Sequence, residues 1–278
     1  MRAREAIARA TWRLQQVGVD SPGTDAELLL AHVLGVPRGR VGLADDLTSE
    51  QAHDMDALVA RRARREPLQH ILGTAAFRYV EVEVGPGVFV PRPETELLAG
   101  WAVDRLRNLQ APVAVDLCTG SGAIALALVN EVPHATVHAV ELSETACDYA
   151  RRNLSGSGVD LRCGDIATAF ADLDGAVDVV VANPPYIPLD AYATVAKEAR
   201  EYDPPLALWS GQDGLDTIRA VETAAARLLR PGGWVGCEHA DVQGESAPQV
   251  FTGSGHWTQV RDRTDLARRP RFVTASRA

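Results

Sequence analysis

The stretch from Val177 to Pro188, VDVVVANPPYIP, constrains the fold of this chain more than any other. Its first half is a β-branched apolar run, which is typical of a strand buried on both faces of a parallel sheet. Two consecutive prolines end that strand after Asn183, because proline cannot donate a hydrogen bond to a neighbouring strand. We therefore expect Asn183 at the carboxyl end of a buried strand, which is where ligands bind in open α/β sheets.

The tetrapeptide Asn183-Pro184-Pro185-Tyr186 has the groups needed to hold a planar –NH2. The side-chain carbonyl of Asn183 and the main-chain carbonyl of Pro184 are two acceptors on a stiff backbone, and each can take one N–H. Tyr186 can lay its ring on the plane that carries the nitrogen. Such a device leaves the third direction open to an electrophile, so we predict that Asn183, Pro184 and Tyr186 are catalytic. The alternative is structural: a proline-rich strand exit with a capping Asn.

The preceding strands predict a nucleoside site at the same edge. The strand 113–117 leads into the tight loop Cys118-Thr119-Gly120-Ser121-Gly122, where glycine allows close approach of a ligand to the backbone. The next strand ends in Glu141, which suits two ribose hydroxyls, and the third in Asp165, which suits an adenine amino group. The predicted cofactor-binding residues are Cys118, Thr119, Gly120, Ser121, Gly122, Glu141, Asp165, Ile166 and Asn183.

A dinucleotide-dependent oxidoreductase is disfavoured by the same loop. Its Gly-x-Gly-x-x-Gly pattern needs a third glycine, and Ala125 stands at that position.

Three segments follow from the patterning of the whole chain. Residues 1–72 are predicted to form a helical domain, with helices over 2–17, 24–35 and 48–65. The second is opened by a capping-box pattern at Thr24 and the third starts at Thr48. Residues 73–90 are predicted to be a β connection that turns at Gly85-Pro86-Gly87. The third segment, 91–278, carries the strand–loop–helix repeats.

The third segment begins with the proline-restrained loop Pro91-Arg92-Pro93-Glu94-Thr95-Glu96, which opens a helix over 97–109. Residues 190–205 are expected to form a polar loop long enough to be a lid. A helix over 216–229, a strand over 234–238 and a closing hairpin over 257–275 complete the predicted order.

Charge and cysteine content limit the function further. The net charge of −9 falls outside residues 1–75, where ten arginines balance ten acidic residues, so the acidic remainder is a poor partner for nucleic-acid phosphates. The chain has no apolar run of membrane-spanning length and no signal peptide pattern. Its four cysteines form no CxxC pair, which favours reduced thiols in a cytoplasmic protein over disulfides or zinc ligands. We expect no metal site and no membrane partner.

Four motifs in order resemble one family: Pro67-Leu68-Gln69-His70-Ile71-Leu72-Gly73, Pro91-Arg92-Pro93-Glu94-Thr95-Glu96, Asp116-Leu117-Cys118-Thr119-Gly120-Ser121-Gly122 and Asn183-Pro184-Pro185-Tyr186. Together they resemble the peptide-chain release factor glutamine methyltransferases, the HemK-type enzymes that depend on S-adenosylmethionine. The resemblance runs from about residue 2 to residue 277. Asn-Pro-Pro-Tyr alone is shared with adenine amino-methylases, whereas the Pro-Arg-Pro-Glu-Thr-Glu segment is far more specific.

The resemblance implies an α/β fold: a seven-stranded Rossmann-like methyltransferase sheet with a reversed last strand, a small helical domain that recognises the substrate, and a β-hairpin connection between them. It also implies S-adenosyl-L-methionine as cofactor and methylation of the glutamine in a release factor's Gly-Gly-Gln loop. Arg92 and Glu94 then join Asn183, Pro184, Pro185 and Tyr186 as predicted substrate-binding residues.

The chain departs from the family pattern at two positions. Cys118 stands where many members have the first glycine of the loop, and Arg268 stands where a glycine is common.

Two other functions remain open from the sequence. An amino-methylase of adenine in DNA or RNA would use the same grip on a flipped base. A non-catalytic module associated with RNA or the ribosome could keep the fold without the reaction. The acidic balance disfavours the first of these, and the intact set of Asn183, Glu141 and Asp165 disfavours the second.

Overall fold

The computed structural model describes residues 1–44 and 46–278, which group into two compact units. The helical unit comprises Met1–Thr74 together with Ala196–Tyr202, and the sheet unit comprises Ala75–Val195 and Asp203–Ala278. The helical unit therefore includes a segment that lies more than a hundred residues beyond the domain boundary expected at residue 72.

The helical unit is built on α1 (Ala3–Gln16), α2 (Pro22–Leu34) and α3 (Ser49–Ala63). Its shorter helices are η1 (Arg38–Leu43), α4 (Leu68–Leu72) and α8 (Lys197–Tyr202). The core forms because the apolar residues of α1 recur every three or four positions and so share one face. That face is made by Ala3, Ala6, Ala10 and Leu14, which pack in one cluster with Leu29, Leu30, Met55 and Val59.

The expected start of α3 is confirmed and that of α2 is wrong. The Thr48 hydroxyl accepts from the Gln51 backbone N–H at 3.1 Å, which caps α3. Helix α2 begins two residues before the predicted Thr24 cap, because Pro22 fits the first helical position, where no N–H is needed. Its end at Gly35, with φ +63°, agrees with the prediction.

The connection between the units begins with a small hairpin of β1 (Thr74–Phe77) and β2 (Val80–Glu83). The hairpin turns at Arg78-Tyr79. The predicted turn at Gly85-Pro86-Gly87 is also present, closed by the Val88 N–H on the Gly85 carbonyl at 3.3 Å, but it follows the hairpin instead of joining its strands. Arg78 has φ +51°, and its guanidinium is fixed on the Glu131 carboxylate at 2.7 Å. That ion pair compensates for a backbone conformation that arginine seldom adopts.

The sheet unit contains a seven-stranded sheet in the order β5-β4-β3-β6-β7-β9-β8. The strands are β3 (Val113–Leu117), β4 (Thr136–Glu141), β5 (Asp160–Cys163), β6 (Val177–Ala182), β7 (Leu229–Glu238), β8 (Trp257–Thr264) and β9 (Pro270–Arg277). The first five in this order are parallel, whereas β9 is antiparallel to both β7 and β8. The expected sheet with a reversed last strand is confirmed.

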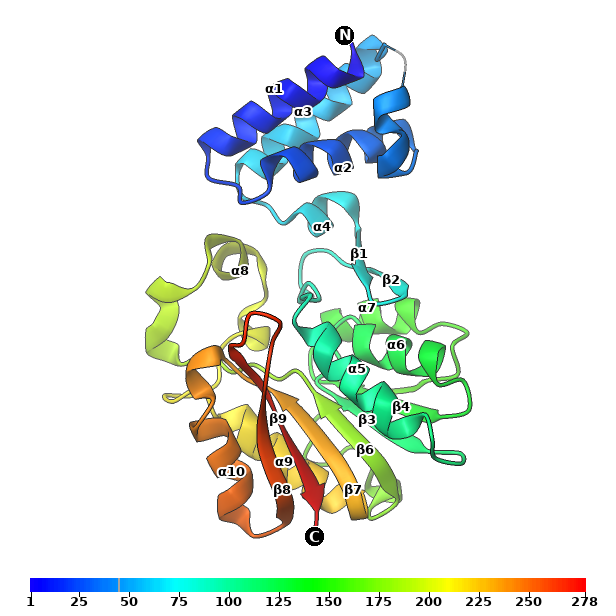
Figure 1. Cartoon of the computed structure of the whole chain (residues 1–278), viewed down its shortest axis with the longest axis vertical. Coiled ribbons are helices and arrows are strands. Elements are labelled where there is room, and N and C mark those ends of the chain that lie inside the picture. The colour runs from blue at the N-terminus through cyan, green and yellow to red at the C-terminus, as the bar shows by residue number, and fades with distance from the viewer. Residues whose placement is uncertain (45) are drawn as a thin grey trace. The chain divides into compact units, whose positions relative to one another are not determined.

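Helices cover both faces of this sheet (Figure 1). On one face α5 (Thr95–Leu106), α6 (Ala123–Glu131) and α7 (Glu144–Asn153) pack on Val179 and Val181. On the other, α9 (Asp216–Leu228) and α10 (Ser246–Ser254) pack on Val180 and Ala182. Alternate residues of β6 thus serve two separate cores, which explains its uninterrupted apolar sequence.

Short helical turns occupy several connections. They are η2 (Ala171–Leu173), η3 (Leu189–Thr194), η4 (Pro205–Ala207) and η5 (Asp241–Gln243). The stretch 190–205, expected to be a polar loop, contains α8 and overlaps η3 and η4, and it contributes α8 to the helical unit.

One expectation about the cysteines is wrong. Cys147 of α7 and Cys163 of β5 form a disulfide, although the chain was expected to keep all its thiols reduced. Sequence spacing did not reveal the pair because α7 folds back beside β5 and brings residues 16 positions apart together. Cys118 and Cys237 are free thiols. Within the described residues, no helix is both long and apolar enough to cross a membrane.

Candidate active site

The carboxyl ends of β3, β4 and β6 bring the predicted site residues to one edge of the sheet. Leu117 of β3 is in register with Val140 of β4 and with Ala182 of β6. The residue after each of these three therefore lies at the same level, and these residues are Cys118, Glu141 and Asn183. Ala182 is also in register with Cys237, so Glu238 of β7 adjoins Asn183.

The loop after β3 is held in place by Asp116, which is fully buried. One of its carboxylate oxygens accepts from the Thr119 hydroxyl at 2.5 Å and from the Ala125 backbone N–H at 3.1 Å, while the other has no hydrogen-bond partner within the described residues. Burial raises the pKa of Asp116 to about 7. The loop conformation thus depends on a carboxyl group that is costly to ionise.

Positive backbone φ angles define the path of the same loop. Gly120 and Gly122 have φ +57° and +84°, values that glycine adopts without strain. A Cβ added at Gly122 would lie 3.0 Å from the Leu154 side chain, so glycine is required there for packing as well. Cys118 has φ +60°, which accounts for the glycine that many family members have at this position.

Glu141 links the loop after β3 to the end of β4. Its two carboxylate oxygens accept from the backbone N–H groups of Gly120 and Ser143, each at 2.8 Å. A carboxylate offers about four lone-pair directions, so each oxygen keeps capacity for a ribose hydroxyl. Burial raises the pKa of Glu141. New hydrogen-bond donors would stabilise its charged form.

The end of β5 supplies the last predicted cofactor residues. Asp165 is exposed, and its Oδ1 accepts from the Ala167 backbone N–H at 2.9 Å, which fixes the carboxylate in a turn. Ile166 is buried in the core on the α9 side of the sheet. The structure therefore leaves Asp165 available for a polar contact and gives Ile166 a packing role.

Asn183 is oriented by a residue from another part of the chain. Its Nδ2 donates to the Thr95 hydroxyl at 3.1 Å, and Thr95 is buried in the first turn of α5. Because the amide nitrogen faces Thr95, the amide oxygen faces the other way. Pro184 is buried and Pro185 half-buried, so the backbone after Asn183 is fixed by two rings and by packing.

Tyr186 and Glu238 form a second buried polar contact in this site. The Tyr186 hydroxyl donates to Glu238 Oε1 at 3.3 Å, and Glu238 is 1% exposed. Burial raises the pKa of Glu238 to about 7, and burial beside this carboxylate also raises the pKa of the Tyr186 phenol. The hydrogen bond from Tyr186 thus offsets only part of the cost of burying the charge of Glu238.

The backbone of Tyr186 is fixed by Gln243 of η5. The buried Gln243 amide donates to the Tyr186 carbonyl at 3.0 Å and to the Gly214 carbonyl at 3.3 Å. A Cβ on Gly214 would lie 2.4 Å from the same Tyr186 oxygen, so the two segments approach closely only because residue 214 is glycine.

Arg92 of the Pro-Arg-Pro-Glu-Thr-Glu loop is paired with Asp203 at 2.5 Å and stacks on the Phe89 ring. The Asp203 side chain is buried, and burial raises its pKa to about 6 despite the arginine. Glu94 immediately precedes α5, and its charge helps to raise the pKa of Glu238. Arg92 is thus held by Asp203 and Phe89, and Glu94 acts on Glu238 through its charge.

Sequence reasoning missed four polar residues of this site: Thr95, Asp203, Glu238 and Gln243. Glu238 could have been found, because an acidic residue ending an apolar strand is the same signal that identified Glu141. Thr95 lies within a motif that was noted for its charges. Asp203 and Gln243 lie in segments without periodicity, and no local pattern indicated them.

No group of three or more His, Cys, Asp or Glu side chains able to hold a metal ion occurs in residues 1–44 or 46–278.

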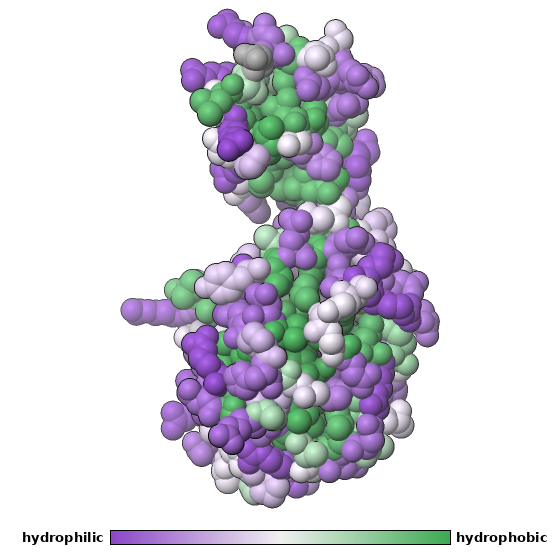
Figure 2. Space-filling model, turned by 90° about the vertical axis from the view of Figure 1, so that its right-hand side faces the viewer, coloured by the Kyte–Doolittle hydropathy of each residue, from purple (hydrophilic) through white to green (hydrophobic). Residues whose placement is uncertain are grey.

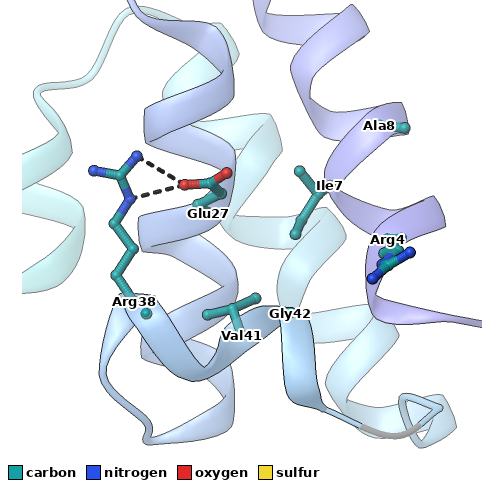
Figure 3. A pocket seen from close by; sticks show the side chains of 8 residues that line it. Arg4, Ile7, Ala8, Glu27, Arg38, Val41 and Gly42 are labelled. Carbon is teal, nitrogen blue, oxygen red and sulfur yellow. Dashed lines mark hydrogen bonds and ion pairs between the residues drawn. The ribbon is translucent and has the colours of Figure 1, made fainter.

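The helical unit has a separate surface hollow of about 630 Å³ (Figure 3). Ile7 and Val41 form its apolar floor, and the Glu27–Arg38 ion pair closes one side. The visible face of this unit shows hydrophobic residues gathered within a hydrophilic surround (Figure 2).

Comparison with known proteins identifies the family. A model of the PrmC N-terminal domain matches residues 5–73, and a methyltransferase domain model matches residues 114–202. A release factor glutamine methyltransferase of Streptomyces coelicolor is 58% identical over 98% of this chain and 97% of its own length. A release factor glutamine methyltransferase of Mycolicibacterium smegmatis is 50% identical over 99% of this chain and 98% of its own length.

Two further matches bear on substrate and fold. A 4-amino-L-phenylalanine/4-methylamino-L-phenylalanine methyltransferase of Streptomyces pristinaespiralis is 43% identical over 93% of this chain and 90% of its own. The solved catalytic domain of hMettl16, in complex with a 3′UTR hairpin, has a TM-score of 0.56 and 17% identity over 79% of this chain and 81% of that one, a likeness in fold alone. By the full-length similarity to its curated relatives, the chain belongs to the release factor glutamine methyltransferase family.

Proposed function

We propose that this enzyme transfers a methyl group from S-adenosyl-L-methionine to the side-chain amide nitrogen of the glutamine in the Gly-Gly-Gln motif of peptide chain release factors. Family membership supports the reaction class. The observation that carries the proposal is the orientation of Asn183, whose Nδ2 is held on Thr95 so that its Oδ1 is presented as an acceptor.

The chemistry required of the protein is to activate a poor nucleophile. The lone pair of an amide nitrogen is delocalised into its carbonyl. Asn183 Oδ1 and the Pro184 carbonyl would each accept one N–H, which favours charge build-up on the nitrogen and directs its lone pair along the open direction. Tyr186 would pack against the amide plane. The nitrogen becomes more acidic as it is methylated, so no strong general base is assigned.

The donor set at the edge of the sheet fits the cofactor. Glu141 and Asp165 retain acceptor capacity for ribose hydroxyls and an adenine amino group, and open space beside Gly120 allows close backbone approach. When bound there, S-adenosyl-L-methionine supplies an electrophilic methyl on a sulfonium. The residues assigned to hold it are Cys118, Thr119, Gly120, Ser121, Gly122, Glu141, Asp165 and Ile166, with a side contact from Asn183.

The helical unit is proposed to dock the body of the release factor. It carries none of the assigned reaction residues, and it has a hollow with an apolar floor and charged rim. Contacts remote from the reacting amide raise its effective concentration at Asn183.

One experiment separates this function from its rivals. Labelled methyl transfer is measured to purified release factor, to the same factor with the Gly-Gly-Gln glutamine changed to alanine, to DNA and RNA, and to an aromatic primary amine. The amine is included because one relative is named for such a substrate. We expect transfer to the unaltered factor alone, and loss of kcat by at least a hundredfold in Asn183→Ala with little change in cofactor affinity, because Asn183 makes at most a side contact to the cofactor. Preferential methylation of nucleic acid or of the amine would reject the proposal.

A further inference from the structure

A chain of buried polar groups extends behind Asn183, away from the proposed substrate. Its members come from three elements: Asn183 follows β6, Thr95 begins α5, and Glu238 ends β7. Thr95 is 3% exposed and Glu238 is 1% exposed. Neither residue reaches the surface, and no role was assigned to either from the sequence.

The Thr95 hydroxyl has one proton to donate, and its oxygen already accepts from Asn183 Nδ2 at 3.1 Å. Glu238 is the acceptor toward which that proton can be directed, because the register of β6 with β7 places this buried carboxylate beside Asn183, whose side chain contacts Thr95. Hydrogen bonding by the Thr95 side chain also acts to lower the pKa of Glu238. Glu238 Oε1 accepts from Tyr186, while the buried Oε2 has no direct partner within the described residues. The carboxylate thus has acceptor capacity to spare.

Above about pH 7 Glu238 is mostly ionised, and an ionised carboxylate can only accept hydrogen bonds, which fixes the direction of the whole chain. If Thr95 donates toward Glu238, its oxygen must accept from Asn183, so the amide nitrogen of Asn183 points inward and Oδ1 points outward. With the side chain of Asn183 flipped, its –NH2 would face the substrate –NH2, donor against donor. The flipped state could not hold the substrate amide.

We infer that Glu238, acting through Thr95, is a positioning residue that sets the side-chain amide orientation of Asn183. The same carboxylate anchors the Tyr186 hydroxyl. The Glu238 carboxylate therefore positions both Asn183, through Thr95, and Tyr186, directly. This inference rests on the proposed role of Asn183 as the acceptor for that amide.

The test uses full-length enzyme, purified release factor and single-turnover kinetics, with cofactor affinity measured by calorimetry. Thr95→Val keeps the shape of the side chain and removes the hydroxyl. We expect it to lower the methyl-transfer rate about tenfold or more, the factor expected for losing one hydrogen bond made in the transition state. KM for the release factor and Kd for the cofactor should stay within twofold. Thr95→Ser, which restores the hydroxyl, should recover the rate to within threefold.

Two variants keep the test independent of folding. Thr274→Val is the matched control, because Thr274 is fully buried in β9 and its hydroxyl donates to the Arg261 carbonyl instead. It should leave the rate unchanged. Glu238→Gln introduces a donor that can reverse the chain, so it should lower the rate while cofactor affinity is retained.

The outcomes distinguish this inference from the proposed function. A Thr95→Val enzyme with a normal rate, beside an inactive Asn183→Ala enzyme, would overturn the positioning role alone. A Thr95→Ser enzyme as slow as Thr95→Val, or a Glu238→Gln enzyme as fast as the wild type, would also overturn it. An Asn183→Ala enzyme with a normal rate would instead refute the proposed site.

Discussion

Arg65, just past the end of α3, holds Glu198 of α8 with two hydrogen bonds of 2.7 Å, although the two residues are 133 positions apart in sequence. Arg62 contacts the same carboxylate at 3.2 Å and also holds Asp25 at 2.7 Å. All four side chains are largely buried. Burial opposes ionisation of Glu198, but the hydrogen bond from Arg65, a backbone hydrogen bond and the charges of both arginines together outweigh it, and the pKa of Glu198 is lowered. The helical unit thus binds a segment of the connection that follows the Asn-Pro-Pro-Tyr motif.

Replacing Glu198 by Ala should release α8 from the helical unit, because it leaves two arginines without their shared buried partner. The expected result is at least tenfold faster amide hydrogen exchange over residues 197–202, with α1 and α2 unchanged. Glu201→Ala is the matched control on the same helix, since Glu201 makes only an exposed pair with Lys197. Equal exchange in the two variants would contradict a latching role for Glu198.

Replacing Glu141 by Ala should weaken binding of S-adenosyl-L-methionine by at least tenfold, since charge-assisted hydrogen bonds contribute about 1.5–3 kcal/mol each. Glu141→Gln keeps one acceptor oxygen, so its affinity for the cofactor should lie between those of the wild type and Glu141→Ala. Glu144→Ala, an exposed acidic residue in the first turn of α7, is the control for lost charge. Calorimetric titration gives the affinities, and an unchanged Kd in Glu141→Ala would place the ribose elsewhere.

The edge of the sheet was predictable from sequence because it depends on local patterns. The apolar runs that become β3 and β6, and the polar residue after each, are visible without any tertiary information. Parallel register then requires Cys118, Glu141 and Asn183 to lie at one level. The Asn183–Thr95 bond was not predictable, since it joins residues 88 positions apart through the placement of α5 on the sheet.

Two local features differ from the sequence pattern for different physical reasons. The hairpin turn at Arg78-Tyr79 uses a positive φ at arginine, whose guanidinium is held by the distant Glu131 carboxylate and the Glu96 carbonyl. Asp25 resembled part of a capping box, yet it lies inside α2 and pairs with Arg62, because Pro22 lets the helix begin earlier.

Replacing Arg268 by Gly should stabilise the protein. Arg268 is exposed and has φ +63°, a left-handed conformation that costs a non-glycine residue about 1–2 kcal/mol. Glycine removes that strain but adds flexibility to the unfolded chain, so the expected gain in unfolding free energy is about 0.5–1 kcal/mol. Leu266→Gly, at an exposed position in the same turn without positive φ, should destabilise instead. Denaturant unfolding of the two variants measures both effects.

Asp116 should make the protein less stable as pH rises from about 4 to about 7. Burial raises its folded pKa from 3.8 to about 7, so the folded state keeps a proton in this range that the unfolded state has lost. The stability difference across the window amounts to about 4 kcal/mol at most. Asp116→Asn should therefore lose less stability than the wild type between pH 5 and pH 8. Asp104→Asn, at an exposed position, should follow the wild-type curve, and parallel curves for all three proteins would refute the assignment.

Docking of the release factor on the helical unit is best tested by a point substitution. Truncation at residue 72 would leave the Glu198 carboxylate without its arginines and so disturb the second half of the chain. Ala8→Glu places a charged side chain at the rim of the hollow, at an exposed position of α1. We expect kcat/KM for intact release factor to fall about tenfold, while a short Gly-Gly-Gln peptide remains an equally poor substrate. Gln15→Glu adds the same charge at an exposed α1 position away from the hollow and should change neither value. If Ala8→Glu lowered kcat/KM for the intact factor and the peptide alike, or for neither, the hollow would have no part in recognition.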